Sequence, residues 1–211
     1  IEDIETAKKK NAEKLTTALI ANGLDTDKNG EISQEELRNA KGQPKVVADY
    51  HLSHVLDLEG LKLTDISILK DLGPNITAIN LDGNDIEELP VFTHATGVTH
   101  MFLGGNEIKN LNPNTFSSMP KLEYVDFDGS SLGDVPQGIF SKNPRLKVLS
   151  LMNANVTSVP EDLIRNNPNL TELYLSENHL TKLSDNFFTL AGTRPSKLKR
   201  VVLTANQLKS L

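Results

Sequence analysis

The chain has 211 residues, of which 37% are hydrophobic and 24% charged, a composition typical of a folded globular protein and not of a disordered one. It contains no cysteine, which excludes disulfides, thiolate metal sites and cysteine nucleophiles. The net charge of −6 and the lack of a long basic run argue against a nucleic-acid partner, and no apolar stretch of about 18 residues predicts a membrane span.

The first quarter of the chain has the spacing of helices. Apolar positions recur every three or four residues from Ile4 to Leu19, which predicts an amphipathic helix. Ser33 and Glu36 match a capping box, so we expect a second helix to begin near Ser33. Residues 45–52 are expected to form either a short third helix or an extended lead-in to the rest of the chain.

Between these two helices, residues 25–36 read DTDKNGEISQEE. The spacing resembles the calcium loop of a single EF-hand, in which all side-chain ligands are oxygen atoms. A set of about six to seven oxygen ligands favours Ca2+ over Mg2+. In this resemblance Glu31 binds the ion through its backbone carbonyl, and Ser33 binds it directly or through water. The implied Ca2+ ligands are Asp25, Asp27, Asn29, Glu31, Ser33 and Glu36.

From about residue 53 the period changes to units of 22 to 28 residues with the pattern LxxLxLxxNxL. Seven units begin near residues 53, 76, 98, 122, 146, 170 and 198, and the last unit is incomplete. The asparagine position holds Asn84, Asn106, Asn178 and Asn206 in four units, and Leu61, Ser130 and Ala154 in the other three. A repeat of this length predicts a solenoid in which each unit buries its leucines only against its neighbours.

This pattern resembles the leucine-rich repeat family, and VPQGIF (135–140) and VPEDLI (159–164) are similar to its typical class. The resemblance implies an α/β fold, a right-handed solenoid with a parallel concave sheet and an irregular or short-helical convex side. We therefore predict an EF-hand-like helical cap over residues 1–52 and repeats over residues 53–211. On the convex side one apolar column is expected to stack, formed by Phe116, Phe140, Ile164 and Phe188.

The helical unit and the first repeat each have an apolar surface that requires a packing partner. EF-hands usually pair, but the sequence contains no second loop of this kind, so the apolar helix faces need another partner. The first repeat would expose Leu56, Leu58 and Leu63 to water, each at a cost of about 1.5–3 kcal/mol. We hypothesise that the helix pair covers the first repeat and that the calcium ion has a mainly structural role.

Strand residues of the repeats alternate between the core and the concave face. The outward positions include large aromatic side chains, which commonly anchor protein interfaces, and several aspartates, which favour a basic partner. The predicted partner-binding residues are His100, Phe102, Tyr124, Asp126, Asp128, Met152 and Tyr174.

The sequence therefore predicts a calcium-binding leucine-rich repeat protein that recognises a protein ligand, such as a host or cell-surface protein. No enzymatic activity is expected, because the chain has no nucleophile–base pair, phosphate-binding glycine loop or HExxH motif. Two alternatives stay open: a targeting domain of a larger enzyme or effector, and a calcium-gated sensor or adaptor. A single weak EF-hand and typical-class repeats favour a secreted or cell-surface location over a cytoplasmic one.

Overall fold

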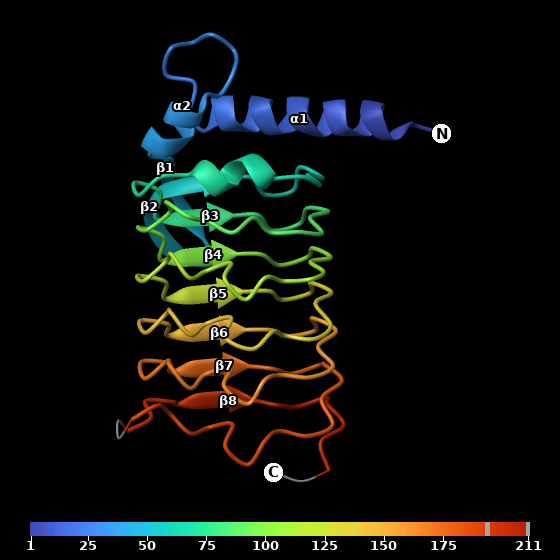
Figure 1. Ribbon diagram of the computed structural model, residues 1–211, viewed down its shortest axis with the longest axis vertical. Helices are drawn as coiled ribbons and strands as arrows, with labels where there is room; N and C mark the ends of the chain where they lie inside the picture. Colours follow the sequence, from blue (N-terminus) through green and yellow to red (C-terminus); the bar gives the residue numbers. More distant parts are fainter. Residues whose placement is uncertain (193–194, 210–211) are drawn as a thin grey trace.

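The computed structural model describes residues 1–192 and 195–209. Two helices, α1 (Ile4–Ala21) and α2 (Gln34–Asn39), lie at one end of an elongated stack of turns (Figure 1). A short 3-10 helix, η1 (Ser67–Asp71), follows in the first turn of the stack. The strands of the described residues are β1 (Gln43–Val47), β2 (Tyr50–Asp57), β3 (Ala78–Asn80), β4 (His100–Phe102), β5 (Tyr124–Asp126), β6 (Val148–Ser150), β7 (Glu172–Tyr174) and β8 (Arg200–Val202).

These strands form one sheet in sequence order, and β2 to β8 pair in parallel. Each strand keeps the register of its predecessor, so Tyr124 lies beside His100 on one side and beside Val148 on the other. The middle residue of each strand from β3 to β7 is buried in the core, as Leu149 is in β6. The predicted parallel sheet of the solenoid is therefore confirmed.

The recurring asparagines bond to the backbone of neighbouring turns. Asn84 donates from Nδ2 to the carbonyl oxygen of Leu58 at 2.8 Å, and its Oδ1 accepts from the N–H groups of Leu61 and Leu63. Ala154 has no such side chain, and there the adjoining turns meet through the backbone, with Leu132 N–H donating to Ala154 O at 2.8 Å. The asparagines of the repeat thus form a ladder of hydrogen bonds along the solenoid, with a gap at Ala154.

A convex-side column stacks as expected in three of its four predicted positions. The rings of Phe116 and Phe140 lie 5.7 Å apart and nearly parallel, and Ile164 is also buried. The prediction for Phe188 is wrong, because its side chain is 44% exposed. Phe187 is buried instead, since the turn that joins its N–H to Ser184 O brings the earlier of the two phenylalanines inward.

The two helices cover the first turn of the solenoid. α1 lies across the end of the stack, and α2 packs beside η1 (Figure 1). Apolar side chains of the helical end belong to the same buried core as those of the first repeat. The helical end contributes Leu15, Leu19, Leu24 and Leu37, and the first repeat contributes Leu56, Leu58 and Leu63. At the closest point, a Cβ on Gly73 would lie 1.8 Å from the carbonyl oxygen of Arg38, so only glycine fits between α2 and the turn after η1.

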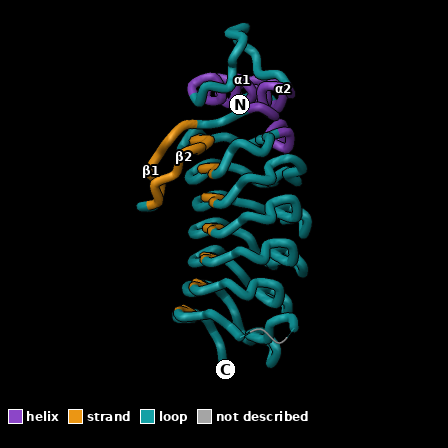
Figure 2. The backbone as a smooth tube through the Cα atoms, turned by 90° about the vertical axis from the view of Figure 1, so that its left-hand side faces the viewer, coloured by secondary structure: helices purple, strands orange, loops and turns teal. Residues whose placement is uncertain are grey.

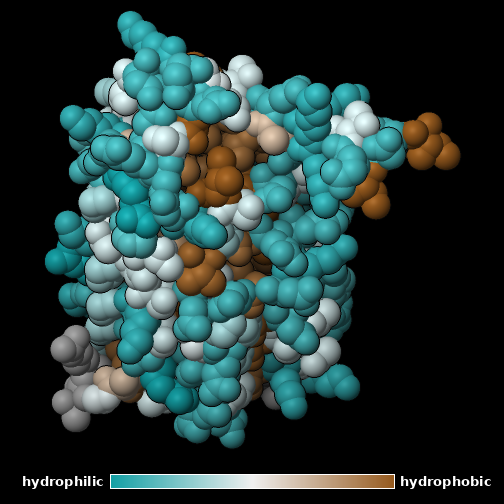
Figure 3. All heavy atoms as spheres, turned by 45° about the horizontal axis from the view of Figure 1, so that its top comes forward, coloured by the Kyte–Doolittle hydropathy of each residue, from teal (hydrophilic) through white to brown (hydrophobic). Residues whose placement is uncertain are grey.

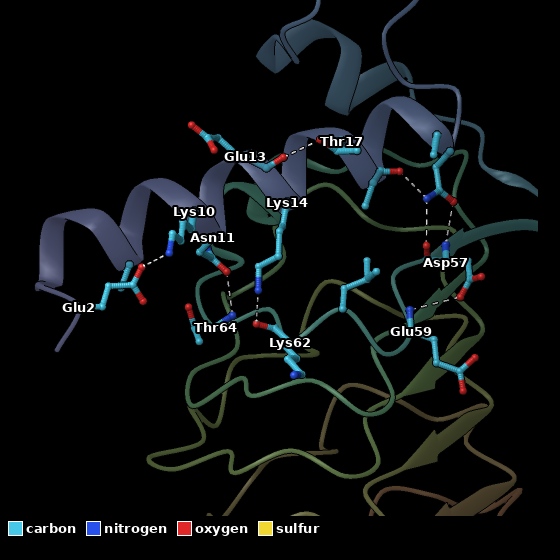
Figure 4. A pocket seen from close by; sticks show the side chains of 15 residues that line it. Glu2, Lys10, Asn11, Glu13, Lys14, Thr17, Asp57, Glu59, Lys62 and Thr64 are labelled. Carbon is cyan, nitrogen blue, oxygen red and sulfur yellow. Dashed lines mark hydrogen bonds and ion pairs between the residues drawn. The ribbon is translucent and has the colours of Figure 1, made fainter.

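Two asparagines of the helical end satisfy the backbone of the first turn. Asn11 of α1 accepts from Thr64 N–H at 2.9 Å (Figure 4) and donates to Asp65 O, also at 2.9 Å. Asn22, at the end of α1, exchanges two hydrogen bonds of 2.9 Å with the backbone of Asp57. These amides satisfy backbone groups of the first turn, as the asparagine ladder does in later turns.

Residues 45–52 form no helix. β1 and β2 make an antiparallel hairpin whose two turn residues, Ala48 and Asp49, have φ values of 48° and 66°. The hairpin leaves the end of the sheet and descends beside the concave face (Figure 2). The boundary predicted between residues 52 and 53 falls inside β2, and the division into two domains stays a prediction.

Candidate functional site

The loop between α1 and α2 gathers three carboxylates. Asp25, Asp27 and Glu36 each place one oxygen within 4.8 Å of the others. Asp25 also folds the loop, because its two oxygens accept from the N–H groups of Asn29 at 3.2 Å and Gly30 at 2.9 Å. Gly30 has φ = 82° and open space around its Cβ position, so the turn requires glycine for its backbone conformation and not for lack of room.

Glu36 links the end of the loop to its beginning. Its Oε1 accepts from Ser33 N–H at 3.0 Å, which completes the capping box of α2, and its Oε2 accepts from Thr26 N–H at 2.7 Å. The hydrogen bond from Ser33 N–H is the main cause that lowers the pKa of this carboxyl group. Glu36 is therefore held as a buried carboxylate beside the two aspartates.

The donor set of the loop fits a hard cation. The converging atoms are all carboxylate oxygens, which Ca2+ prefers. The N–H of Asn29 lowers the pKa of Asp27, but partial desolvation, the hydrogen bond with Asp25 and the charges of Glu36 and Asp25 together outweigh it and raise that pKa overall. A cation among the three would relieve this repulsion.

The other predicted ligands make hydrogen bonds within the loop. Asn29 Oδ1 accepts from Glu31 N–H at 2.9 Å, and Ser33 Oγ accepts from Glu36 N–H at 3.1 Å. The structure thus brings together three of the six residues as one carboxylate cluster. Asn29, Glu31 and Ser33 lie along the same loop and shape its turns.

The hairpin divides the concave face into a covered half and an open half. In the covered half, His100 and Phe102 are 8% and 1% exposed. The ring of Tyr50, at the hairpin turn, lies 4.6 Å from that of His100 and 5.1 Å from that of Tyr124. Phe102 points to the concave side as expected, but it packs in a small cluster with Val47 of the hairpin and is not an exposed anchor.

The remaining predicted contact residues lie on or just after β5 to β7, within the open half that β5 to β8 form, and Tyr124 of β5 also borders the hairpin. They are partly exposed there: Tyr124, Asp126, Asp128, Met152 and Tyr174. The hydroxyl groups of both tyrosines are oriented, since Tyr124 donates to Asp126 at 3.1 Å and Tyr174 donates to Glu172 at 2.8 Å. Arg200 lies 5.7 Å from the centre of the Tyr174 ring, a cation–π distance.

Carboxylates crowd the centre of this face. Burial, together with the charges of neighbouring carboxylates, raises the pKa values of Asp82 and Asp128 to about 6. Both side chains are held in place, because Asp82 accepts from Gly104 N–H at 2.8 Å and Asp128 accepts from Ser150 Oγ at 2.6 Å. A cationic group would be attracted to this part of the sheet.

Sequence reasoning missed the hairpin and with it Tyr50. Apolar residues alternate at Tyr50 and Leu52, a period of two that could have indicated a strand. The turn gave no signal, because Ala48 and Asp49 adopt positive φ values where glycine or asparagine is usual. Asn11 was also missed as a backbone partner, since it occupies an apolar position of the predicted helix.

A comparison with protein families decides the class of the protein. The family model described as leucine rich repeat matches residues 74–132, 122–180 and 144–208. The chain belongs to the leucine rich repeat family. Among the described residues of this leucine-rich repeat protein, none of the helices is long and apolar enough to cross a membrane.

Solved leucine-rich repeat structures resemble the chain in part. A chain of the octameric complex of Latrophilin 3, Unc5D and FLRT2 (LRR) is 27% identical, with a TM-score of 0.55 over 64% of this chain. The APL1 leucine-rich repeat domain is 26% identical, with a TM-score of 0.54 over 64%. A chain of the LRIM1/APL1C complex is 26% identical, with a TM-score of 0.59 over 68%. The matches span 39%, 35% and 26% of those chains, respectively.

Proposed function

We propose that this leucine-rich repeat protein recognises a protein partner through the open half of its concave face. The observation that carries the proposal is the array of partly exposed side chains on β5 to β8, in which Tyr174, Met152 and the carboxylates do not belong to the cluster around the hairpin. Aromatic side chains on a rigid sheet commonly act as anchors, and the carboxylates favour a partner with basic residues. Two of the similar structures are protein complexes, which supports a recognition role over a catalytic one.

The test compares two variants in a pull-down from cell-surface proteins, quantified by mass spectrometry. The first carries Met152→Ser and Tyr174→Ala on the open half, and the second carries Phe188→Ala on the exposed convex side. We expect a protein that wild type and Phe188→Ala retain and that the concave-face variant loses by about tenfold or more. Equal retention by all three proteins would contradict the proposal, provided that their unfolding temperatures agree.

We further propose that the loop of Asp25, Asp27 and Glu36 binds Ca2+ and that the ion is mainly structural. The support is the cluster of three carboxylates together with its attachment to α2, since Glu36 is both a cluster member and part of the α2 capping box. The apolar side of α2 packs into the core of the first repeat through Leu37. Binding of Ca2+ would therefore stabilise the helical end against the solenoid.

Calcium dependence of unfolding tests this role. A chelator, or Asp25→Ala with Glu36→Ala, is expected to lower the unfolding temperature of the whole domain, and added Ca2+ should raise it only in wild type. Glu35→Ala, an exposed neighbour in α2, serves as the control. An unchanged unfolding temperature in chelator would contradict a structural ion. A calcium effect on partner affinity alone would favour the sensor alternative.

The proposed ion also bears on location. Single EF-hand loops of the weak class bind Ca2+ at about 10⁻⁴–10⁻³ M, so they are filled outside cells and empty in resting cytosol. A structural ion of this affinity requires the extracellular calcium concentration. We therefore propose a secreted or cell-surface location, and a measured Kd below about 10⁻⁶ M would remove this argument.

A further inference from the structure

A groove runs along the side of α1 that faces η1, away from the concave face. Its volume is about 580 Å³, and its lining includes the buried side chain of Leu15. Two exposed isoleucines also line the groove, Ile4 of α1 and Ile68 of η1, which are 74% and 42% exposed. Figure 3, which views this side of the helical end, has hydrophobic atoms in a hollow between hydrophilic rims. The groove thus exposes apolar side chains that nothing in the described chain covers.

An acidic wall continues the groove onto the second and third repeats. A second hollow of about 750 Å³ shares Lys8, Thr64, Asp65 and Ser67 with the first, so the two are continuous. Its lining includes five carboxylates: Asp65, Asp85, Glu87, Glu88 and Glu107. None of the ion pairs between described residues includes any of the five. Their charges are therefore free to attract a cationic partner.

The lining of the groove favours one conformation of a bound segment. The two hollows are formed by α1, η1 and the loop residues of the repeats, and no residue of a described strand lines them. A bound segment therefore cannot extend a backbone ladder and has to satisfy its own backbone groups. A helix does so, and it can present apolar side chains to Ile68 and basic side chains to the carboxylates.

We propose that this groove, defined by Ile4, Leu15 and Ile68 on its apolar floor and by Glu87 and Glu88 on its acidic wall, binds a basic amphipathic helix of a partner protein. The groove lies apart from the concave face, so the molecule has two separate surfaces for protein contacts. The acidic wall gives the second surface its selectivity for basic segments, and the isoleucines give it apolar contact area.

The test uses a phage-displayed library of random peptides of about 16 residues, long enough for about four helical turns. Wild type is the bait, and a variant with Glu87→Gln, Glu88→Gln and Ile68→Ser serves for counter-selection. We expect enriched peptides with a positive net charge and apolar residues spaced three or four apart. Enrichment of neutral or acidic peptides, or of peptides that the variant retains, would overturn the proposal.

Matched variants then separate the groove from general charge attraction. For one enriched synthetic peptide, Glu87→Gln with Glu88→Gln and, separately, Ile68→Ser are each expected to raise the Kd about fivefold. Glu177→Gln with Asp185→Asn removes two charges from exposed positions on the last repeats, and Phe188→Ser removes an exposed apolar side chain. These controls and Tyr174→Ala on the concave face should leave the Kd within about twofold.

Two outcomes would refute the assignment. Equal weakening by the control variants would mean that net charge alone attracts the peptide. Self-association of wild type that Ile68→Ser abolishes would mean that a second copy of the chain occupies the groove. Unchanged unfolding temperatures of all variants exclude misfolding as the cause of any loss.

Discussion

The repeats and the helical end satisfy the backbone of the solenoid in different ways. Within the repeats an asparagine bonds to the turn before it in four of the seven units, with the same geometry at Asn84, Asn106, Asn178 and Asn206. At the helical end two single asparagines, Asn11 within α1 and Asn22 at its end, bond to the backbone of the first turn. A periodic region can be read from its pattern, whereas the end of a solenoid depends on single side chains that no pattern identifies.

The largest effect is expected inside the repeats, at Asn178. Its amide makes five hydrogen bonds, to Ala154 N, Val156 N, Leu151 O, Leu175 O and Ser176 O. Asn178→Ala leaves Ala154 N–H, Val156 N–H and Leu151 O without this partner, and we expect the free energy of unfolding to fall by about 3–5 kcal/mol in urea denaturation. Asn186→Ala, at an exposed position, is the control. A loss below about 1 kcal/mol would mean that water replaces the amide.

A smaller and more local effect is expected at the helical end. Gly73→Ala places a Cβ against Arg38 O and disturbs the hydrogen bond of 3.1 Å from Gly73 N–H to Leu37 O. We expect a loss of about 1–3 kcal/mol, with faster hydrogen exchange in α1 and α2 but not in β5 to β7. Gly133→Ala, where φ is positive and no atom lies within 4 Å, controls for backbone strain alone. Equal acceleration in all repeats would show that the two regions unfold as one unit.

The smallest effect concerns the acidic centre of the concave face. The folded state raises the pKa of Asp82 from 3.8 to about 6, so its carboxylate opposes folding at neutral pH. Asp82→Asn should therefore stabilise the protein by about 1–2 kcal/mol near neutral pH, because Oδ1 can still accept from Gly104 N–H. The gain should shrink as the pH falls through 6 and vanish toward 3.8, as measured by thermal unfolding. A gain independent of pH would rule out charge as its cause.

The covered half of the concave face has the opposite pH dependence. Burial lowers the pKa of His100, which packs in neutral form against Tyr50 of the hairpin. A group whose pKa is lowered by folding withdraws stability as the pH falls below its unfolded value of 6.5. Acidification should therefore weaken the contact between His100 and the hairpin, and it should reduce the repulsion between the carboxylates of the concave face.

The sequence predicted the repeated part of the fold well and the unique part poorly. The solenoid, its parallel sheet and the outward columns follow from a period that recurs through the chain, so an error in one unit is corrected by the others. The prediction failed at Phe188, the last position of the predicted convex-side column, in the unit whose spacing to the next unit lengthens to 28 residues. The hairpin occurs once, and its turn lacks glycine, so neither repetition nor local composition indicated it.

The candidate sites also differ in how far the sequence predicted them. The loop of Asp25 and Glu36 has a strict spacing, which made its residues readable, although only the structure places three carboxylates together. The concave residues were identified by alternation, but alternation does not reveal what covers them. His100 and Phe102 lie under a segment about 50 residues away along the chain, and no local rule predicts that contact.

The missing amide at Ala154 has a mechanical consequence. Every turn of the stack is joined to the next by strand pairing, but at this position the asparagine column has no side chain that reaches back to the preceding turn. When the two ends are pulled apart, other hydrogen bonds carry the load at this junction, because Thr157 Oγ1 and Ser158 Oγ both donate to Asp134 and Thr157 N–H donates to Gly133 O. The load should therefore pass through the side of the solenoid that holds Asp134 and not through the asparagine column.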